Sequence, residues 1–355
     1  MAVIAVIRES HPGETRVAAT PETVRKLIAS GFEVAVQAGA GTAAACLDAD
    51  YAAAGARLCA SAAEAVAGAD ILFGVRAPSA EALAAVKPGT LVAASLNPHQ
   101  DRAGLEALAA RGAEAYALEF IPRITRAQVM DVLSSQANLA GYRAVIEASA
   151  AYGRALPMMM TAAGTIAAAK VFVMGVGVAG LQAIATARRL GAIVEGYDVR
   201  AAVKDQVESL GAKFVDIDIK AEGAGGYARE LTAEEKAQQQ AILARHVAAA
   251  DVLITTAAIP GRPSPKIISR EMVEGMKGGS VIVDLAAEGG GNCELTQPGE
   301  TILHHRVKIH GPINVPSTVS GHASELYAKN LLNLLGLLIK DGQVHIDLDD
   351  QILKD

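Results

Sequence analysis

One stretch near the middle of the chain, residues 170–180, constrains the fold more than any other. It reads KVFVMGVGVAG, an apolar run followed at once by glycines at 175, 177 and 180. Such a run is typical of a buried strand, and the residues after it, Leu181–Leu190, have a helical apolar pattern. A strand, a tight glycine turn and a helix in this order predict one βα unit of a parallel sheet.

The same alternation of strands and helices extends along the chain on both sides of this unit. The expected strands are Ala2–Ile7, Phe32–Gln37, Arg57–Cys59, Ile71–Val75, Leu91–Leu96 and Glu114–Leu118 in a first series, and Lys170–Met174, Ile193–Tyr197, Asp251–Thr255, Val281–Leu285 and Val307–His310 in a second. Two such series predict an α/β protein with mostly parallel sheets. A chain of 355 residues is long enough for about two domains.

Several helices can also be placed from the sequence. Thr20 and Pro21 supply an N-cap and a first helical position, and this helix ends before Gly31. A long helix is expected over Gln128–Ala155. A leucine-rich helix over Ala323–Lys340 is apolar nearly all round, so we expect it to be buried between layers.

Composition excludes several classes of protein. Hydrophobic residues make up 51% of the chain and charged ones 20%, which excludes a disordered chain, and the net charge of −6 gives no footprint for nucleic acid. The N-terminus lacks the long apolar run of a signal peptide. Residues 155–187 carry one charge, at Lys170, but proline and glycines interrupt them. We therefore interpret them as a buried strand and a glycine-rich turn, and expect a soluble chain.

The glycines at 175, 177 and 180 form the G-x-G-x-x-G pattern of a dinucleotide site. The first glycine permits the turn, the second lets the backbone approach a pyrophosphate, and the third lets helix and strand pack closely. Asp198, at the end of the next expected strand, is placed to accept hydrogen bonds from a ribose, which favours NAD over NADP. Arg200 leaves an alternative open, because it can accommodate a 2′-phosphate or simply neutralise Asp198.

A polar segment, residues 221–240, follows where a strand would normally come next. Gly223, Gly225 and Gly226 permit large backbone changes, and Tyr227 follows them directly. One interpretation is a solvated loop leading into a polar helix. The one we favour is a lid that closes over the nucleotide.

A second polar concentration lies between the two βα series, in IPRITRAQVMDVLSSQANLAGYRA, residues 121–144. Arg123 and Asp131 could form a solvated ion pair, with Gln128 on the surface. Such pairs contribute only about 0–1 kcal/mol, so stability explains the concentration poorly. A cluster that holds a carboxamide and a ribose explains it better.

Together these features resemble the NAD(H)-binding component of proton-translocating nicotinamide nucleotide transhydrogenases. The motifs that carry the resemblance are RESHPGETRVAATPE, PRITRAQVMDVLSSQANLAGYRAV, PMMMTAAGT, GVGVAGLQAIATARRLGA, YDVRAA, GGYAREL, LITTAAIPGRPSP, DLAAEGGGNC and HASELYAKNLLNL. They occur in order over nearly the whole chain. Because no membrane span is expected, the chain is similar to the separately encoded alpha subunit of that family.

The resemblance implies two Rossmann-like domains, with a discontinuous first domain (residues 1–140 and 315–355) completed by the C-terminal helix, and an NAD(H)-binding domain over 141–314. It implies a homodimer that transfers hydride directly between NADH bound here and NADP⁺ bound on a beta-subunit partner. It further implies coupling to proton movement through a membrane subunit. The expected place is therefore the cytoplasmic face of a bacterial inner membrane.

Roles for individual residues follow from the resemblance. Arg123, Gln128 and Asp131 match a loop that positions the dihydronicotinamide, and Thr125, Arg126 and Ser134 belong to the same contact region. Matches to the nucleotide contacts are Gly175, Gly177, Val178, Gly180, Asp198, Val199, Arg200, Gly226, Gln239 and Ala258. Tyr227 matches a tyrosine that closes on the bound nucleotide.

The related alanine dehydrogenases are the main alternative. They need a lysine and a histidine, and the corresponding positions fall near Arg76 and Asn97, with His99 two residues beyond. Loss of both groups removes the acid–base chemistry of an amino-acid dehydrogenase. A non-catalytic NAD-sensing subunit is a third hypothesis.

We expect no metal site. His304, His305 and His310 have no Cys, Asp or Glu at ligand spacing, so we interpret them as surface or loop residues. Cys293 has no neighbouring base and is expected to be packed rather than nucleophilic.

Overall fold

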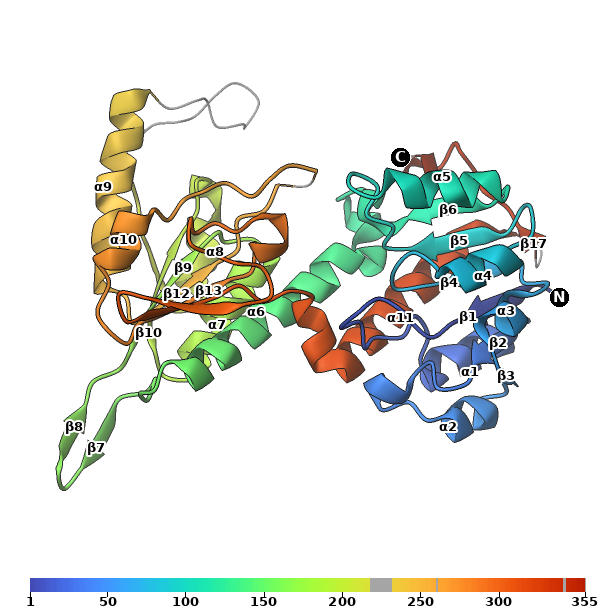
Figure 1. The fold of residues 1–355 in the computed structure, drawn as a ribbon, viewed down its shortest axis with the longest axis horizontal. Helices are drawn as coiled ribbons and strands as arrows, with labels where there is room; N and C mark the ends of the chain where they lie inside the picture. Colours follow the sequence, from blue (N-terminus) through green and yellow to red (C-terminus); the bar gives the residue numbers. More distant parts are fainter. Residues whose placement is uncertain (218–231, 260, 341–342, 355) are drawn as a thin grey trace. The chain divides into compact units, whose positions relative to one another are not determined.

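The computed structural model describes residues 1–217, 232–259, 261–340 and 343–354. The chain forms two compact units (Figure 1). Unit 1 comprises Met1–Gln136 and Pro316–Asp355, and unit 2 comprises Ala137–Val315. Both carry mostly parallel sheets, so the predicted α/β class is confirmed. Gly226 and Tyr227, with the rest of the expected lid hinge, lie outside the described residues.

Unit 1 is built on a six-stranded parallel sheet of order β3-β2-β1-β4-β5-β6. The strands are β1 (Val3–Val6), β2 (Glu33–Gln37), β3 (Arg57–Cys59), β4 (Ile71–Phe73), β5 (Leu91–Ala94) and β6 (Glu114–Ala117). Successive side chains of β1 alternate between two cores, Ile4 and Val6 in one and Ala5 in the other. Burial on both faces explains why these strands consist of nearly continuous apolar residues.

Helices cover both faces of this sheet. They are α1 (Pro21–Ala29), α2 (Asp48–Ala53), α3 (Ala62–Val66), α4 (Ala80–Ala85), α5 (Arg102–Ala110), α11 (Ser320–Leu338) and α12 (Gln351–Lys354), with the 3₁₀ turns η1 (Thr42–Ala44), η2 (Leu118–Phe120) and η3 (Thr125–Met130). The N-cap at Thr20 is confirmed, since its side chain accepts a hydrogen bond from the Thr23 N–H. The start of this helix could be placed from the sequence because such a cap is local.

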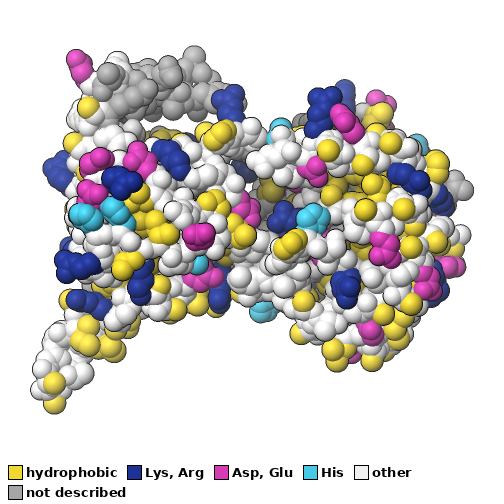
Figure 2. All heavy atoms as spheres, viewed as in Figure 1, with side chains coloured by type: hydrophobic (Ala, Val, Ile, Leu, Met, Phe, Trp, Pro, Cys, Tyr) yellow, Lys and Arg dark blue, Asp and Glu magenta, His cyan; other side chains and the backbone are white. Residues whose placement is uncertain are grey.

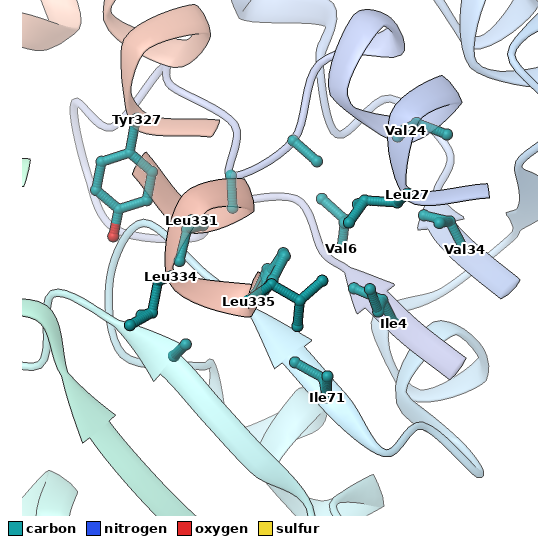
Figure 3. Close-up of a cluster of buried hydrophobic side chains, with 14 of the residues drawn as sticks. Ile4, Val6, Val24, Leu27, Val34, Ile71, Tyr327, Leu331, Leu334 and Leu335 are labelled. Carbon is teal, nitrogen blue, oxygen red and sulfur yellow. The ribbon is translucent and has the colours of Figure 1, made fainter. Parts of the chain in front are cut away.

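The C-terminal helix α11 packs on the unit 1 sheet. Leu335 lies beside Ile4, Val6 and Ile71 in Figure 3, and Tyr327 and Leu331 belong to the same buried cluster. Each fully buried leucine contributes about 2 kcal/mol by removal of apolar surface from water. The expectation of burial all round is wrong, because Leu326 is 37% exposed. The helix is one-sided, and it ends at Leu338, where β16 (Ile339–Lys340) pairs with β17 (Gln343–Val344).

Unit 2 contains a seven-stranded sheet of order β11-β10-β9-β12-β13-β15-β14. Its strands are β9 (Lys170–Met174), β10 (Ile193–Tyr197), β11 (Lys213–Phe214), β12 (Val252–Thr255), β13 (Val281–Asp284), β14 (Thr301–His304) and β15 (Val307–His310). Of these seven described strands, β14 alone runs antiparallel. The sequence did not reveal β11, which is very short, or β14, which alternates exposed and half-buried residues.

The helices of unit 2 also form two layers. They are α6 (Val132–Ala151), which begins in unit 1, α7 (Val178–Arg189), α8 (Lys204–Ser209), α9 (Ala233–Ala249) and α10 (Arg270–Glu274), with the 3₁₀ turns η4 (Ala201–Val203), η6 (Ala287–Gly289) and η7 (Val315–Val319). One core contains side chains of α6, α7 and α8, and the other contains side chains of α9 and α10.

The long helix predicted over Gln128–Ala155 is shorter than expected. Residues 125–130 form the 3₁₀ turn η3, and α6 begins only at Val132. The break is at Asp131, whose backbone is extended (φ −72°, ψ 93°) and whose carboxylate accepts the Ser134 N–H at 2.9 Å. An aspartate that caps a helix in this way ends the preceding turn and starts a new helix.

The interpretation of residues 155–187 as a buried strand and a glycine-rich turn is only partly confirmed. The second half of this range supplies β9 and α7, but residues 159–166 form an exposed hairpin of β7 (Met159–Thr161) and β8 (Gly164–Ile166). The Thr161 hydroxyl bonds the turn, and Gly164 has φ 136°. Across the described ranges, no helix has the length and apolar character needed to span a bilayer.

Candidate functional site

In unit 2 the predicted dinucleotide residues lie at one edge of the sheet. Residues 175–178 follow β9, residues 198–200 follow β10, and residues 256–258 follow β12. These three strands are parallel neighbours, so their carboxyl ends meet. The chain crosses from one side of β9 to the other at this place, which makes the space between β9 and β12 the topological switch point where such sheets bind ligands.

The three motif glycines have different surroundings. A Cβ on Gly180 would lie 1.9 Å from the carbonyl oxygen of Gly175, and Gly175 itself has φ 88°. Gly175 and Gly180 are therefore required for the fold itself, whether or not a ligand binds. A Cβ on Gly177 would meet no protein atom within 4 Å among the described residues. Its place in the turn fits close approach of a pyrophosphate, because a side chain there would obstruct only a ligand.

Asp198 is held rigidly at this edge. Its carboxylate accepts a hydrogen bond from the Val176 N–H at 2.8 Å. It also forms a bidentate salt bridge with Arg200, in which Nε lies 2.9 Å from Oδ1 and a terminal guanidinium nitrogen lies 3.0 Å from Oδ2. Burial alone would raise the pKa of Asp198, but the hydrogen bonds from Arg200 and Val176 outweigh it and lower that pKa. Asp198 therefore stays a carboxylate that can accept ribose hydroxyls. Arg200 takes the neutralising arrangement that was left open as an alternative.

The remaining cofactor candidates of unit 2 surround this edge. Val178, Val199 and Ala258 are exposed, and Gln239 on α9 donates to the buried Tyr197 hydroxyl at 2.6 Å. The Gln239 contact links α9 to the end of β10. Gln239 is therefore oriented by Tyr197 at this edge.

Two positioning residues here were missed by sequence reasoning. Asn292, fully buried, accepts the Ala257 N–H at 2.9 Å and donates to the Ala257 carbonyl at 2.7 Å, which fixes the loop after β12. Asp284, also fully buried, accepts from Thr255, Thr296 and the Cys293 N–H. Cys293 is packed as expected, and burial raises the pKa of its thiol. Asp284 and Asn292 both belong to the motif DLAAEGGGNC, which was the one sign of them in the sequence.

In unit 1 the polar segment 122–134 forms a pocket of about 370 Å³. It is lined by Pro122, Arg123, Ile124, Gln128, Asp131 and Ser134. All four residues that were expected to act in hydride transfer therefore line one concave surface. Asp131 bonds the Ser134 hydroxyl at 2.5 Å in addition to the Ser134 N–H, so among the described residues its carboxylate pairs with Ser134 rather than with Arg123.

The η3 turn of this segment is held by hydrogen bonds and a salt bridge to residues far away in the sequence. Asn330 and Asn333 of α11 both donate to the Val129 carbonyl, at 2.7 and 3.1 Å. Arg126 forms a two-pronged pair with Asp350, at 2.8 and 2.6 Å. Thr125 and Arg126 are exposed on η3, and Arg126 is engaged with protein. Sequence reasoning missed Asn330, Asn333 and Asp350, since nothing local marks them.

Unit 1 also contains a buried ionic cluster. Glu14 bonds Arg16 at 2.7 Å and Arg76 at 3.2 Å, and it accepts the Ser317 hydroxyl at 2.7 Å. Burial opposes ionisation of Glu14, but Arg16 and Ser317 outweigh it and lower its pKa to about 2. The cluster includes Arg76, near the position where an amino-acid dehydrogenase would need its lysine. A carboxylate therefore already pairs with both arginines.

The histidines interpreted as surface or loop residues are half-buried or exposed, and each lies close to an acidic side chain. His310 bonds Thr301 at 2.6 Å and Glu147 at 2.9 Å. His304 bonds Glu274 at 2.9 Å, and His305 lies 4.0 Å from the same carboxylate oxygen. Glu274 was not expected as their partner because it comes from α10, about 30 residues earlier in the sequence.

Comparison with known proteins gives a consistent assignment. The model of the alanine dehydrogenase/PNT N-terminal domain matches residues 5–140, and that of the alanine dehydrogenase/PNT C-terminal domain matches residues 144–355. An NAD(P) transhydrogenase alpha subunit of Rhodospirillum rubrum is 50% identical over 359 residues, covering 99% of this chain and 92% of the relative. Alanine dehydrogenase of Mycobacterium tuberculosis is 31% identical, covering 89% and 82%.

A solved structure of transhydrogenase from Sinorhizobium meliloti has a TM-score of 0.91 and is 48% identical, covering 99% of this chain and 96% of that one. The resemblance inferred from the motifs is confirmed by these matches. The chain belongs to the alanine dehydrogenase/PNT family.

Proposed function

We propose that this protein is the NAD(H)-binding subunit of a proton-translocating NAD(P) transhydrogenase. It binds NADH and passes hydride to NADP⁺ carried by a beta-subunit partner. The observation that carries the proposal is the pocket of unit 1, which Arg123, Gln128, Asp131 and Ser134 line, with no histidine or lysine among the described residues that line it. The identity to transhydrogenase alpha subunits over nearly the full chain supports it.

The dinucleotide supplies the hydride, which leaves one nicotinamide ring and is accepted by another without a proton transfer. The work of this chain is therefore to bind and orient. The turn at Gly175–Gly180 and the helix start at Val178 would hold the pyrophosphate, and Asp198 would hold the adenosine ribose. Gln128 and Arg123 offer amide and guanidinium donors for a carboxamide, and the Asp131–Ser134 pair offers an acceptor for a ribose hydroxyl.

Orientation of this kind matters because hydride transfer requires close approach of the two reacting carbons and exclusion of water. We infer that NAD(H) rather than NADP(H) binds here, because Asp198 would repel a 2′-phosphate and Arg200 is paired with Asp198.

The assembly we propose contains two copies of this chain, a beta subunit that binds NADP(H) and a membrane subunit that conducts protons. It would lie at the cytoplasmic face of the inner membrane through those partners. The exposed methionines of the β7–β8 hairpin support self-association, since Met158 and Met160 are 61% and 78% exposed and hydrophobic side chains gather on this hairpin in Figure 2. Analytical ultracentrifugation of Met160→Ser would test this, and an unchanged dimer fraction would exclude the hairpin.

The direct test mixes the purified chain with the NADP(H)-binding domain of a beta subunit. NADH oxidation with an NADP⁺ analogue, dependent on both proteins, is the expected result. Binding of NADH without hydride exchange would favour a sensing subunit instead.

An alanine dehydrogenase is the second candidate, favoured by the 31% identical relative. It predicts NADH oxidation with pyruvate and ammonia in the absence of a partner. The Glu14 cluster weighs against it, because Arg76, near the position of the lysine that such an enzyme needs, is already paired with Glu14. Activity with pyruvate and ammonia alone would overturn the transhydrogenase proposal.

A further inference from the structure

A second group of ligating side chains lies in unit 2, on elements that do not contribute to the dinucleotide edge. Glu274 ends α10, and His304 and His305 lie at the turn between β14 and β15. One carboxylate oxygen and one nitrogen from each ring all lie within 4.8 Å of one another. Figure 2 shows histidine side chains together with acidic and basic ones on the surface over α10.

The separations suit a small cation. The Nε2 of His304 is 2.9 Å and the Nε2 of His305 is 4.0 Å from the same Oε1 of Glu274. Around tetrahedral zinc, with bonds of about 2.0–2.1 Å, two ligand atoms lie about 3.3 Å apart. The observed distances bracket this value, so small side-chain rotations would bring the three atoms into coordination.

The turn that presents the two rings is unusual. His305 and Arg306 have φ 45° and 63°, the left-handed values of a two-residue hairpin turn that favours Asn and Gly. A left-handed non-glycine residue costs roughly 1–2 kcal/mol. Consecutive strand residues point to opposite faces, but here the two rings stack, with centroids 4.9 Å apart. The costly turn places both rings on the same side.

The scaffold beneath these groups is well packed. Met272 and Val273 of α10 and Val307 and Ile309 of β15 belong to one buried cluster. The end of α10 and the turn are therefore fixed relative to each other before any ion binds. Preorganised ligands lose little conformational entropy on coordination.

Two cationic residues, Lys277 and Arg306, are close in sequence to these three ligand candidates. Lys277 is paired with Asp251 at 2.9 Å and donates to the Ala249 carbonyl. The Arg306 guanidinium lies against the backbone of Gly278, where a Cβ would be 2.7 Å from its central carbon.

We propose that Glu274, His304 and His305 form a binding site for a zinc-class divalent ion. Two imidazole nitrogens and one carboxylate oxygen suit zinc better than magnesium or calcium, which prefer sets of oxygen ligands. Water would complete the coordination. The ion would connect the end of α10 to the β14–β15 turn and stabilise unit 2 through preferential binding to the folded chain.

The test is calorimetric titration of the full chain with zinc chloride. We expect one site, with His304→Ala and Glu274→Gln each weakening binding by about tenfold or more, since each removes one ligand atom. His322→Ala, an exposed histidine in unit 1, is the matched control and should bind zinc as the wild type does. Equal affinity in all variants, or zinc binding that is lost instead in Cys46→Ser, would overturn the proposal.

His305→Asn separates a ligand role from a structural one. Asparagine favours the left-handed turn, so this variant should fold as stably as the wild type without zinc, yet bind zinc at least about tenfold more weakly. Cobalt gives a second readout, because its visible absorption reports the ligand field. We expect a tetrahedral spectrum in the wild type that is lost in His305→Asn. A spectrum and zinc affinity unchanged in His305→Asn would exclude the site.

Discussion

The two candidate binding regions are built in different ways. The dinucleotide edge of unit 2 consists mainly of backbone: a glycine turn, a helix start and one carboxylate held by adjacent groups. The pocket of unit 1 is lined by side chains before, within and after η3, a turn whose position depends on α11 and on Asp350 near the C-terminus. Changes at the first region should act on folding or on affinity, and changes at the second on placement of the reacting ring.

The largest expected effect separates two glycines within one motif. Gly180→Ala would force a Cβ to 1.9 Å from the Gly175 carbonyl, so we expect a loss of about 3 kcal/mol in stability and loss of NADH binding. Gly177→Ala is the matched variant. It should leave the melting temperature unchanged and weaken NADH binding by more than about tenfold, as measured by thermal unfolding and titration. Equal destabilisation by both would show that Gly177 is also required by packing.

In the unit 1 pocket, Gln128→Asn should mainly affect rate. We expect hydride transfer to slow by about tenfold or more while the Kd for NADH changes less than about threefold, because the shorter amide misplaces the ring and leaves the main contacts intact. Single-turnover kinetics and equilibrium titration measure the two quantities. Gln206→Asn, on the surface of unit 2, is the control. Equal losses in rate and in NADH affinity would show that Gln128 contributes to binding itself, and not mainly to placement of the ring.

Asp198→Ala should change cofactor preference. NADH binding should weaken by roughly tenfold, and the preference for NADH over NADPH should narrow, because the variant releases Arg200 to meet a 2′-phosphate. Competitive titration with both dinucleotides measures the ratio. An unchanged ratio would show that Asp198 does not read the ribose.

Buried charge in unit 1 predicts a pH dependence of stability. Burial raises the pKa of Glu9 to about 7 from 4.5, although Val75 N–H donates to its carboxylate at 2.6 Å. Glu9 ionises at lower pH in the unfolded chain than in the folded one, so the free energy of unfolding should fall by about 3 kcal/mol as pH rises from 4.5 to about 7. The free energy of unfolding, measured with denaturant at each pH, should decrease less steeply with pH in Glu9→Gln than in the wild type. Glu81→Gln, at an exposed position, is the control and should keep the wild-type pH dependence of stability. An unchanged pH dependence in Glu9→Gln would show that Glu9 has an ordinary pKa in the folded chain.

The smallest expected effect is at Asp350. Asp350→Asn weakens its pair with Arg126, so η3 should be held less firmly, and hydride transfer should slow by about threefold with NADH affinity unchanged. High salt should produce part of the same effect in the wild type, because this pair is exposed. Asp349→Asn, its neighbour, is the control. A full wild-type rate in Asp350→Asn would show that α11 alone holds the loop.

Much of the fold could be predicted because its signals are local. Strands buried on both faces are nearly continuous apolar runs, as at Lys170–Met174, and Thr20 marks a helix start with its own side chain. The exposed hairpin at 159–166 and the short strands β11 and β14 gave no such signal. Their formation depends on pairing with distant neighbours or on a turn.

The α/β class, the glycine turn and the family could all be inferred from the amino acids, because these depend on neighbours in the chain and on motifs. Other features became visible only in the folded chain: Asp131 caps α6, Asn330 and Asp350 hold η3, and Glu274 meets two histidines. The physical reason is that hydrogen bonds and coordination act over about 3 Å in space. Residues far apart in the chain reach that distance only when it has folded.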